Sequence, residues 1–204
     1  MKKVVLPVFA AFLLWFVMFS PLTAPHVGFW PMMTFSAVSL SVFAALFGPE
    51  WRGRLRFSVA DILLGAALAA ALWGVFWLGD KISSAIFPFA RPEVDAVYGI
   101  KEGISPVLLS LLLLLLIGPA EEIFWRGFVQ ERISGSLGAD RGFLITTALY
   151  AAVHIASCNF MLVMAALVAG VVWGLGYRFF PERFTALVVS HALWDAAVFV
   201  WMPV

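Results

Sequence analysis

The feature that most constrains this chain is a cluster of charges directly behind its most apolar run. The run covers residues 107–117, and Glu121, Glu122 and Arg126 follow within the next nine positions. A charge near the centre of a bilayer costs about 2.5 to 3.5 kcal/mol on insertion scales, and such residues usually face a protein interior or a water-filled cavity. The chain must therefore fold so that its apolar segments enclose these three side chains.

The composition indicates an integral membrane protein. Hydrophobic residues make up 63% of the 204 residues and charged residues 12%, with a mean hydropathy of +1.01, whereas soluble domains are about 45 to 50% apolar. Residues 1–204 are expected to form one membrane-embedded domain in contact with the lipid bilayer. The net charge of +1 argues against nucleic acid as a partner, since that binding needs a dense basic face. Cys158 is the only cysteine, so no disulfide can form within the chain.

Turn signals divide the chain into about seven membrane helices, which predicts an all-α, polytopic bundle. The apolar run that follows Lys2 and Lys3 resembles a signal peptide. No convincing cleavage site follows this run, so we expect a retained helix. The interval 80–102 is expected to be a loop with one short surface helix, and an eighth helix is left open if it enters the membrane. The expected spans are about 4–19, 27–46, 57–78, 104–133, 143–156, 160–180 and 184–201.

The distribution of basic residues predicts a cytoplasmic N-terminus, because cytoplasmic loops carry an excess of Lys and Arg. With seven spans, only Lys81, Arg91 and Lys101 fall on the outer side. The residues on the inner side are Lys2, Lys3, Arg52, Arg54, Arg56, Arg126, Arg132, Arg141, Arg178 and Arg183.

The charged cluster is expected to lie inside a long fourth helix. Ser105-Pro106 is typical of a helix start, and the first convincing stop is the segment 134–136. In the sixth span, Gly170 and Gly174 form a small-xxx-small pattern suited to close helix contact.

Three of the later helices carry ionisable groups that can meet at one depth. Counted from the expected cytoplasmic ends at 1.5 Å per residue, Glu121 and His154 lie about 20 Å deep, Asp195 about 18 Å and His191 about 12 Å. The motif-bearing core is therefore about 104–201.

Spacing within the helices separates the roles of these groups. Glu122 and Arg126 are four residues apart in the favourable acid-before-base order, so they can form a buried ion pair, which could also be a purely structural clamp. Glu121 points elsewhere and is the candidate general base. His191 and Asp195 are also four residues apart: either Asp195 orients the imidazole, or both reach the same ligand or substrate atom.

These residue types favour activation of water against a carbonyl. The chain has no HExxH pair, and its Gly135-Ser136-Leu137-Gly138 segment reads better as a helix stop than as a nucleophile turn. A carboxylate base with two histidines and an aspartate in a partly dry cavity suits hydrolysis of a peptide bond.

Three motifs, taken together, resemble those of the CPBP family of intramembrane proteases, which includes CAAX-protease, bacteriocin-processing and Abi proteins. They are Glu121-Glu122-x-x-x-Arg126, Tyr150-x-x-x-His154 and His191-x-x-x-Asp195, in this order on three helices. The resemblance implies that Glu121 and His154 activate the attacking water, that His191 and Asp195 stabilise the oxyanion, and that Glu122 and Arg126 support the site. It also implies a helical core that opens toward the cytosolic side.

The chain departs from the family pattern at two positions. The second motif usually has phenylalanine where this chain has Tyr150, a change expected to alter packing and leave catalysis intact. The last position is often asparagine, and an ionised Asp195 would repel an oxyanion. Asp195 must therefore be protonated, orient His191 or help to bind a metal.

The sequence leaves the cofactor, the substrate and a non-catalytic role open. A metal-independent glutamic mechanism is favoured over a zinc or other divalent metal site built from Glu121, His154, His191 and Asp195. The expected partner is a protein or peptide substrate in the membrane, of unspecified identity. The alternative is an immunity or scaffold protein, or a proton-coupled transporter, that uses the buried charges as a clamp or relay. The resemblance indicates the bacterial cytoplasmic membrane.

Overall fold

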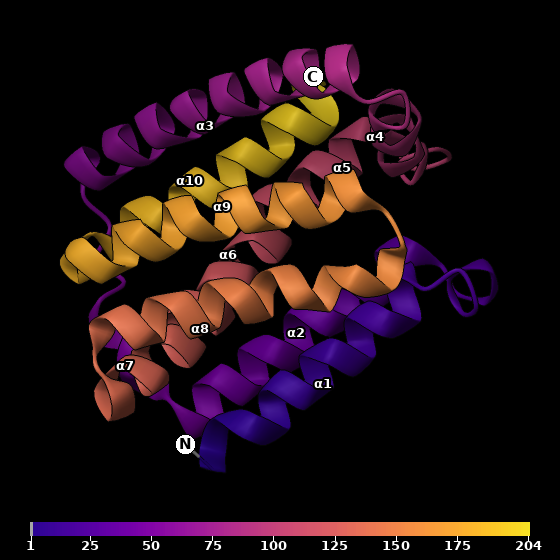
Figure 1. Cartoon of the computed structure of the whole chain (residues 1–204). Coiled ribbons are helices and arrows are strands. Elements are labelled where there is room, and N and C mark those ends of the chain that lie inside the picture. Colours follow the sequence, from indigo (N-terminus) through magenta and orange to yellow (C-terminus); the bar gives the residue numbers. More distant parts are fainter. Residues whose placement is uncertain (1) are drawn as a thin grey trace.

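The protein is an all-helical membrane bundle. The computed structural model describes residues 2–204, which are helical or in turns without any β-strand. This confirms the predicted fold class (Figure 1). The helices are α1 (Lys2–Phe19), α2 (Phe29–Phe47), α3 (Val59–Ile86), α4 (Ala90–Gly99), α5 (Pro106–Leu112), α6 (Gly118–Glu122), α7 (Glu131–Leu137), α8 (Ala139–Ala152), α9 (Phe160–Phe179) and α10 (Phe184–Ala196).

The charged cluster lies inside one long helix, as the sequence predicts. Two π-helical segments, Leu113–Ile117 and Ile123–Gln130, join α5, α6 and α7 into a continuous helix over Pro106–Leu137. Pro106 occupies the first helical position, where its missing N–H costs nothing. The helix ends at Gly138, whose φ of 89° favours glycine.

Five helical segments of the described chain are long and apolar enough to cross a membrane: α2, α3, Pro106–Leu137, α9 and Pro181–Trp201, the last of which contains α10. Two further helices lie alongside them in Figure 1. These are α1, an apolar helix just below the same length, and α8, which continues through a 3₁₀ turn at Val153–Ser157. The seven predicted spans thus correspond to seven helices of the bundle.

The predicted end of the third span is wrong. We expect it at residue 78 from the change to polar residues, yet α3 continues to Ile86. Asp80 is buried, and its Oδ1 lies 3.2 Å from Nη1 of Arg91, so its charge is neutralised within the bundle. The helix therefore continues to Ile86, two residues before Pro88. The short surface helix expected in the interval 80–102 is α4. Its ten residues span about 15 Å, too short to cross a bilayer core of about 30 Å.

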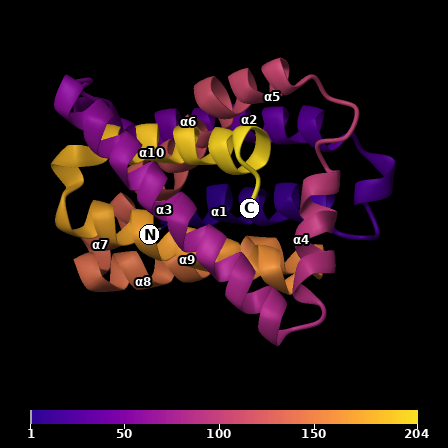
Figure 2. The ribbon, with the colours of Figure 1, turned by 90° about the horizontal axis from the view of Figure 1, so that it is seen from above.

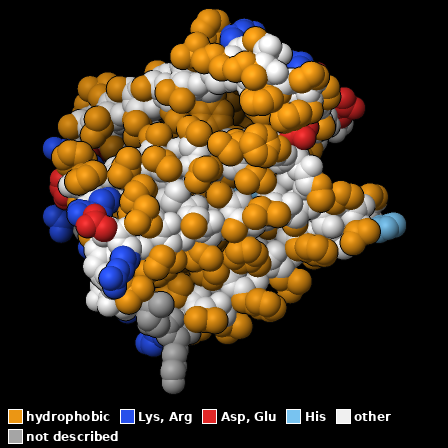
Figure 3. Space-filling view, in the orientation of Figure 1, with side chains coloured by type: hydrophobic (Ala, Val, Ile, Leu, Met, Phe, Trp, Pro, Cys, Tyr) orange, Lys and Arg blue, Asp and Glu red, His pale blue; other side chains and the backbone are white. Residues whose placement is uncertain are grey.

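The bundle has two distinct ends. The N- and C-termini lie at opposite ends (Figure 1), α3 crosses the other helices obliquely, and α4 lies across one end (Figure 2). We call this the α4 end; it also holds the α1–α2 and α8–α9 turns. The opposite end holds the α2–α3, α7–α8 and α9–α10 turns, and we call it the basic end because most of the Lys and Arg side chains on the face shown in Figure 3 gather there. Hydrophobic side chains cover the middle of that face, as a lipid-facing surface requires.

Candidate active site

The first part of the site depends on close packing of α6 against α10. A Cβ atom added to Gly118 would lie 2.7 Å from Cα of Ala192, so only glycine permits this approach. The contact places the side chain of Glu122 against that of His191. We call the continuous helix Pro106–Leu137 the motif helix. Gly170 and Gly174 of α9 lie against side chains of α8, which confirms their predicted role in close helix packing.

Glu122 organises a fully buried ion pair. Its Oε1 accepts hydrogen bonds from Nη1 of Arg126 and from Nδ1 of His191, each at 2.9 Å. Glu122 is 0% exposed and Arg126 1%. The guanidinium also donates to the carbonyl oxygen of Gly170 at 3.4 Å, which ties the motif helix to α9. The predicted Glu122–Arg126 pair is therefore confirmed in its geometry.

His191 is fixed on both ring edges and on one face. Its ring stacks on Trp173, with centroids 3.8 Å apart, and its Nε2 lies 3.5 Å from Oδ2 of Asp195. Because Nδ1 faces the carboxylate of Glu122, Nδ1 carries a proton and Nε2 is the nitrogen that faces Asp195. The imidazole is thus oriented chiefly by Glu122, a partner that we do not predict from the spacing of His191 and Asp195.

Glu121 points away from this pair and toward α8. The hydroxyl of Tyr150 donates to Oε2 of Glu121 at 2.8 Å. Within residues 2–204, the hydrogen bond to this carboxylate goes to Oε2, and Oε1 is left without a partner on the side of the cavity. The expectation that Tyr150 affects packing alone is incomplete, because the hydroxyl that phenylalanine lacks is bonded to the candidate base.

His154 is held by two hydrogen bonds. The indole N–H of Trp15 donates to its Nε2 at 3.1 Å, and its Nδ1 lies 2.8 Å from the carbonyl oxygen of Tyr150. An indole can only donate, so Nε2 is the acceptor and Nδ1 carries the proton. His154 is therefore neutral in this arrangement, with its basic nitrogen already engaged. Trp15 comes from α1, far from the three motifs, and no sequence signal identifies it.

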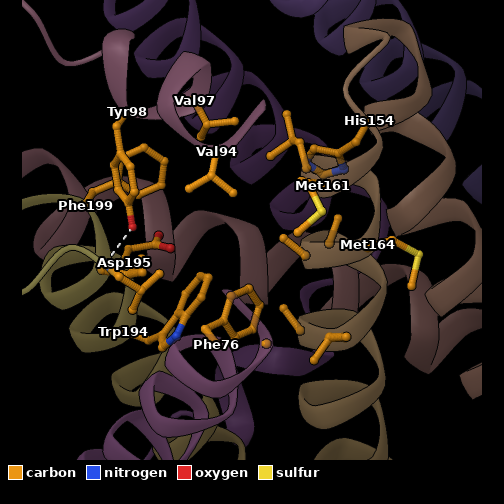
Figure 4. A pocket seen from close by; sticks show the side chains of 18 of the residues that line it. Phe76, Val94, Val97, Tyr98, His154, Met161, Met164, Trp194, Asp195 and Phe199 are labelled. Atoms are coloured by element: carbon orange, nitrogen blue, oxygen red, sulfur yellow. Dashed lines mark hydrogen bonds between the residues drawn. The ribbon is translucent and has the colours of Figure 1, made fainter. Parts of the chain in front are cut away.

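One cavity of about 440 Å³ brings the predicted catalytic residues together. Glu121, His154, His191 and Asp195 all line it, while Glu122 and Arg126 lie behind its wall. Most of the other lining side chains are apolar and come from α3, α4 and α9, including Phe76, Val94, Met161 and Met164 (Figure 4). The arrangement provides an apolar pocket with a carboxylate oxygen free to bind a water molecule.

The ring nitrogens of the site limit how a metal ion could bind. Nε2 of His154 is occupied by the indole of Trp15, whereas only Nδ1 of His191 is bonded to Glu122 and its Nε2 is not blocked by that bond. Within residues 2–204, no group of three or more His, Cys, Asp or Glu side chains is arranged to hold a metal ion. Glu121, His154, His191 and Asp195 line one cavity without forming such a group, and chelation tests metal dependence.

Comparison with known proteins identifies a family match in the segment that carries the motifs. Residues 103–197, which contain all three motifs, match the family model described as type II CAAX prenyl endopeptidase Rce1-like. No curated protein and no solved structure matches the chain.

Proposed function

We propose that this chain, whose residues 103–197 match the type II CAAX prenyl endopeptidase Rce1-like model of the CPBP family, hydrolyses a peptide bond of a membrane-associated protein or peptide. In this proposal Glu121 activates the attacking water. The observation that carries this proposal is the position of Glu121. Its carboxylate lines the apolar cavity, Tyr150 occupies one oxygen, and the other oxygen is free.

In the proposed reaction Glu121 acts first as a base and then as an acid. Oε1 takes a proton from a water molecule while the water oxygen attacks the carbonyl carbon of the substrate. The tetrahedral intermediate collapses as the C–N bond breaks, and the proton on Glu121 passes to the leaving amine. The Tyr150 hydroxyl keeps the carboxylate turned toward the cavity in both steps.

His191 is the proposed stabiliser of the oxyanion. Its orientation is set before the reaction by Glu122 and by stacking on Trp173, and such preorganised donors give the largest catalytic effects. In this role Nε2 is protonated and donates to the oxyanion. The Asp195 carboxyl, 3.5 Å from Nε2, holds a separate proton of its own in this step, so it does not repel the oxyanion.

His154 is assigned a positioning role. It can share the attacking water with Glu121 only after Nε2 releases the indole of Trp15. With that bond intact, His154 fixes the end of α8 beside the cavity and thereby places Tyr150 against Glu121.

The test is quantitative mass spectrometry of protein termini on membranes that contain the wild-type protein or Glu121→Gln at matched levels. New termini that appear with the wild type alone would support the proposal and name the substrate. Equal termini from two folded proteins, with candidate substrates expressed, would overturn it in favour of a binding or transport role. His26→Gln, a change in the α1–α2 turn, is the matched control and should cleave as the wild type does.

A further inference from the structure

The cavity occupies one half of the bundle. Each helix that lines it contributes residues from the half nearest the α4 end, including the last two turns of α1 and the first turn of α2. The lining segments are Trp15 and Phe19 of α1, Phe29–Met33 of α2, Val75–Ser83 of α3 with Phe87 just after it, Val94–Tyr98 of α4, Leu113–Glu121 of the motif helix, Tyr150 of α8 with His154 just after it, Phe160–Ala169 of α9 and the last part of the chain from His191. Glu121 thus lies at the deep end of a cavity that extends toward α4.

The basic end of the bundle is closed below Glu121. Phe128 and Phe184 are both 0% exposed there. Beyond them, Nη2 of Arg54 pairs with Oε1 of Glu131 at 2.6 Å, and the hydroxyl of Tyr177 donates to Oε2 of the same carboxylate at 3.0 Å. Packed aromatic rings and an ion pair therefore separate the candidate site from the basic end.

The mouth of the cavity lies between α3 and α9. Among the lining residues, Val75 of α3, Phe87 just after α3 and Phe160 of α9 are 51%, 43% and 52% exposed, so this rim faces the surroundings of the bundle. Helix α4 bridges the two walls. Its Glu93 accepts a hydrogen bond from the backbone N–H of Met161 at 2.9 Å, and its Arg91 pairs with Asp80.

The charges in the cavity define what can enter it. Its lining contains Asp80, Glu121 and Asp195 but neither Lys nor Arg. The imidazole of His191 is already paired with Glu122. A segment with acidic side chains, or one that ends in a free carboxylate inside the cavity, would therefore find no unpaired cation in a region of low dielectric. An apolar, uncharged stretch of peptide suits both the lining and the volume.

We propose that the substrate enters from the α4 end, between α3 and α9, as an uncharged apolar peptide segment rather than as a chain end with its free carboxylate. This inference rests on the proposed function. The Lys and Arg distribution puts the basic end in the cytosol, so the segment comes from the extracytoplasmic half of the bilayer. This differs from the cytosolic opening implied by the family resemblance.

The side of entry can be tested without activity, because Cys158 is exposed and lies in the α8–α9 turn at the α4 end. A membrane-impermeant maleimide applied to intact cells should label Cys158, while Cys158→Ser removes the signal. The double variant Cys158→Ser, Ser136→Cys carries its single cysteine at the basic end. It should be labelled only after the cells are opened. The reverse pattern would place the mouth on the cytosolic side and overturn the proposal.

The entry route is tested by a pair of variants on α9. Ala165 lines the cavity and Val163 does not, so Ala165→Trp should reduce cleavage at least tenfold while Val163→Trp stays within about twofold of the wild type. Equal cleavage by both folded variants would exclude this route.

Two peptides of the same apolar sequence test the proposed exclusion of a free carboxylate from the cavity. One has a free and the other an amidated C-terminus three residues after the cleaved bond, and the amidated form should be cleaved at least tenfold faster. A wild type that cleaves nothing would count against the proposed function, while the labelling result would still decide the side of the mouth.

Discussion

The indole nitrogen of Trp15 donates a hydrogen bond to Nε2 of His154 at 3.1 Å. The two residues are 139 positions apart, and Trp15 lies outside the segment 103–197 that matches the family model. The edge of the Trp15 ring also packs against the imidazole, with centroids 6.1 Å apart. The first helix therefore completes the candidate active site in addition to covering it.

Removing this hydrogen bond should slow the reaction modestly. Trp15→Phe keeps an aromatic ring but no N–H, and a hydrogen bond of this kind contributes about 0.5 to 1.5 kcal/mol. We expect kcat to fall about two- to tenfold with KM little changed, measured on purified protein. An increase in kcat would instead show that Trp15 restrains a basic His154, and would return the role of second base to that residue.

Tyr150→Phe tests the hydroxyl that the family pattern usually lacks. The change removes the 2.8 Å hydrogen bond to Glu121, and bonds to charged groups contribute about 1.5 to 3 kcal/mol. We expect kcat to fall about tenfold or more, while the thermal midpoint shows that the protein remains folded. Wild-type kcat in the variant would mean that the hydroxyl has no part in orienting the base.

The sequence is sufficient to predict the features that depend on local spacing. Apolar runs and breakers locate the helices, and the four-residue interval predicts the Glu122–Arg126 pair and the different direction of Glu121. Where polarity changes without a breaker, the prediction fails: α3 passes Asp80 because Arg91 neutralises that side chain. A polar residue ends a membrane helix only if no partner compensates its charge.

Contacts between distant helices could not be predicted in this way. The partners Trp15–His154, Tyr150–Glu121 and Glu122–His191 all join different helices. Each depends on which helix faces lie together, which a single sequence does not specify. Gly118 is a partial signal, since a glycine inside a membrane helix indicates a close approach, but it does not name the partner helix.

The two neighbouring glutamates should separate stability from activity. Glu122→Gln leaves Arg126 buried without its carboxylate, and breaking a buried pair costs about 3 to 5 kcal/mol. We expect a clearly lower thermal midpoint in detergent for this variant. Glu121→Gln should have a midpoint close to that of the wild type with no cleavage. Similar midpoints for both variants would contradict the clamp role of Glu122.

Chelation distinguishes the two mechanisms left open by the sequence. If Glu121 activates water without a metal, incubation with EDTA or phenanthroline followed by desalting should leave cleavage within about twofold of the untreated protein. Metal analysis of the active, purified protein provides the control. Loss of activity that added zinc restores would replace the glutamic mechanism with a metal-dependent one.

Gly118→Ala should damage the site without changing any of its chemical groups. The new methyl group would meet the backbone of Ala192 at 2.7 Å, and a backbone contact cannot move aside as a flexible side chain would. The resulting separation of α6 from α10 should weaken the 2.9 Å contact between Glu122 and His191. Overpacking of this kind costs about 1 to 3 kcal/mol.

The matched control for this change is Gly135→Ala in α7, where an added Cβ would meet no atom within 4 Å. Alanine at such a helical position stabilises by about 0.5 to 1 kcal/mol. We expect Gly118→Ala to lower the thermal midpoint and reduce cleavage at least tenfold, and Gly135→Ala to do neither. If Gly118→Ala kept wild-type cleavage, the close approach of α6 to α10 would not be what positions His191, and the preorganised oxyanion site proposed for this protein would lose its structural basis.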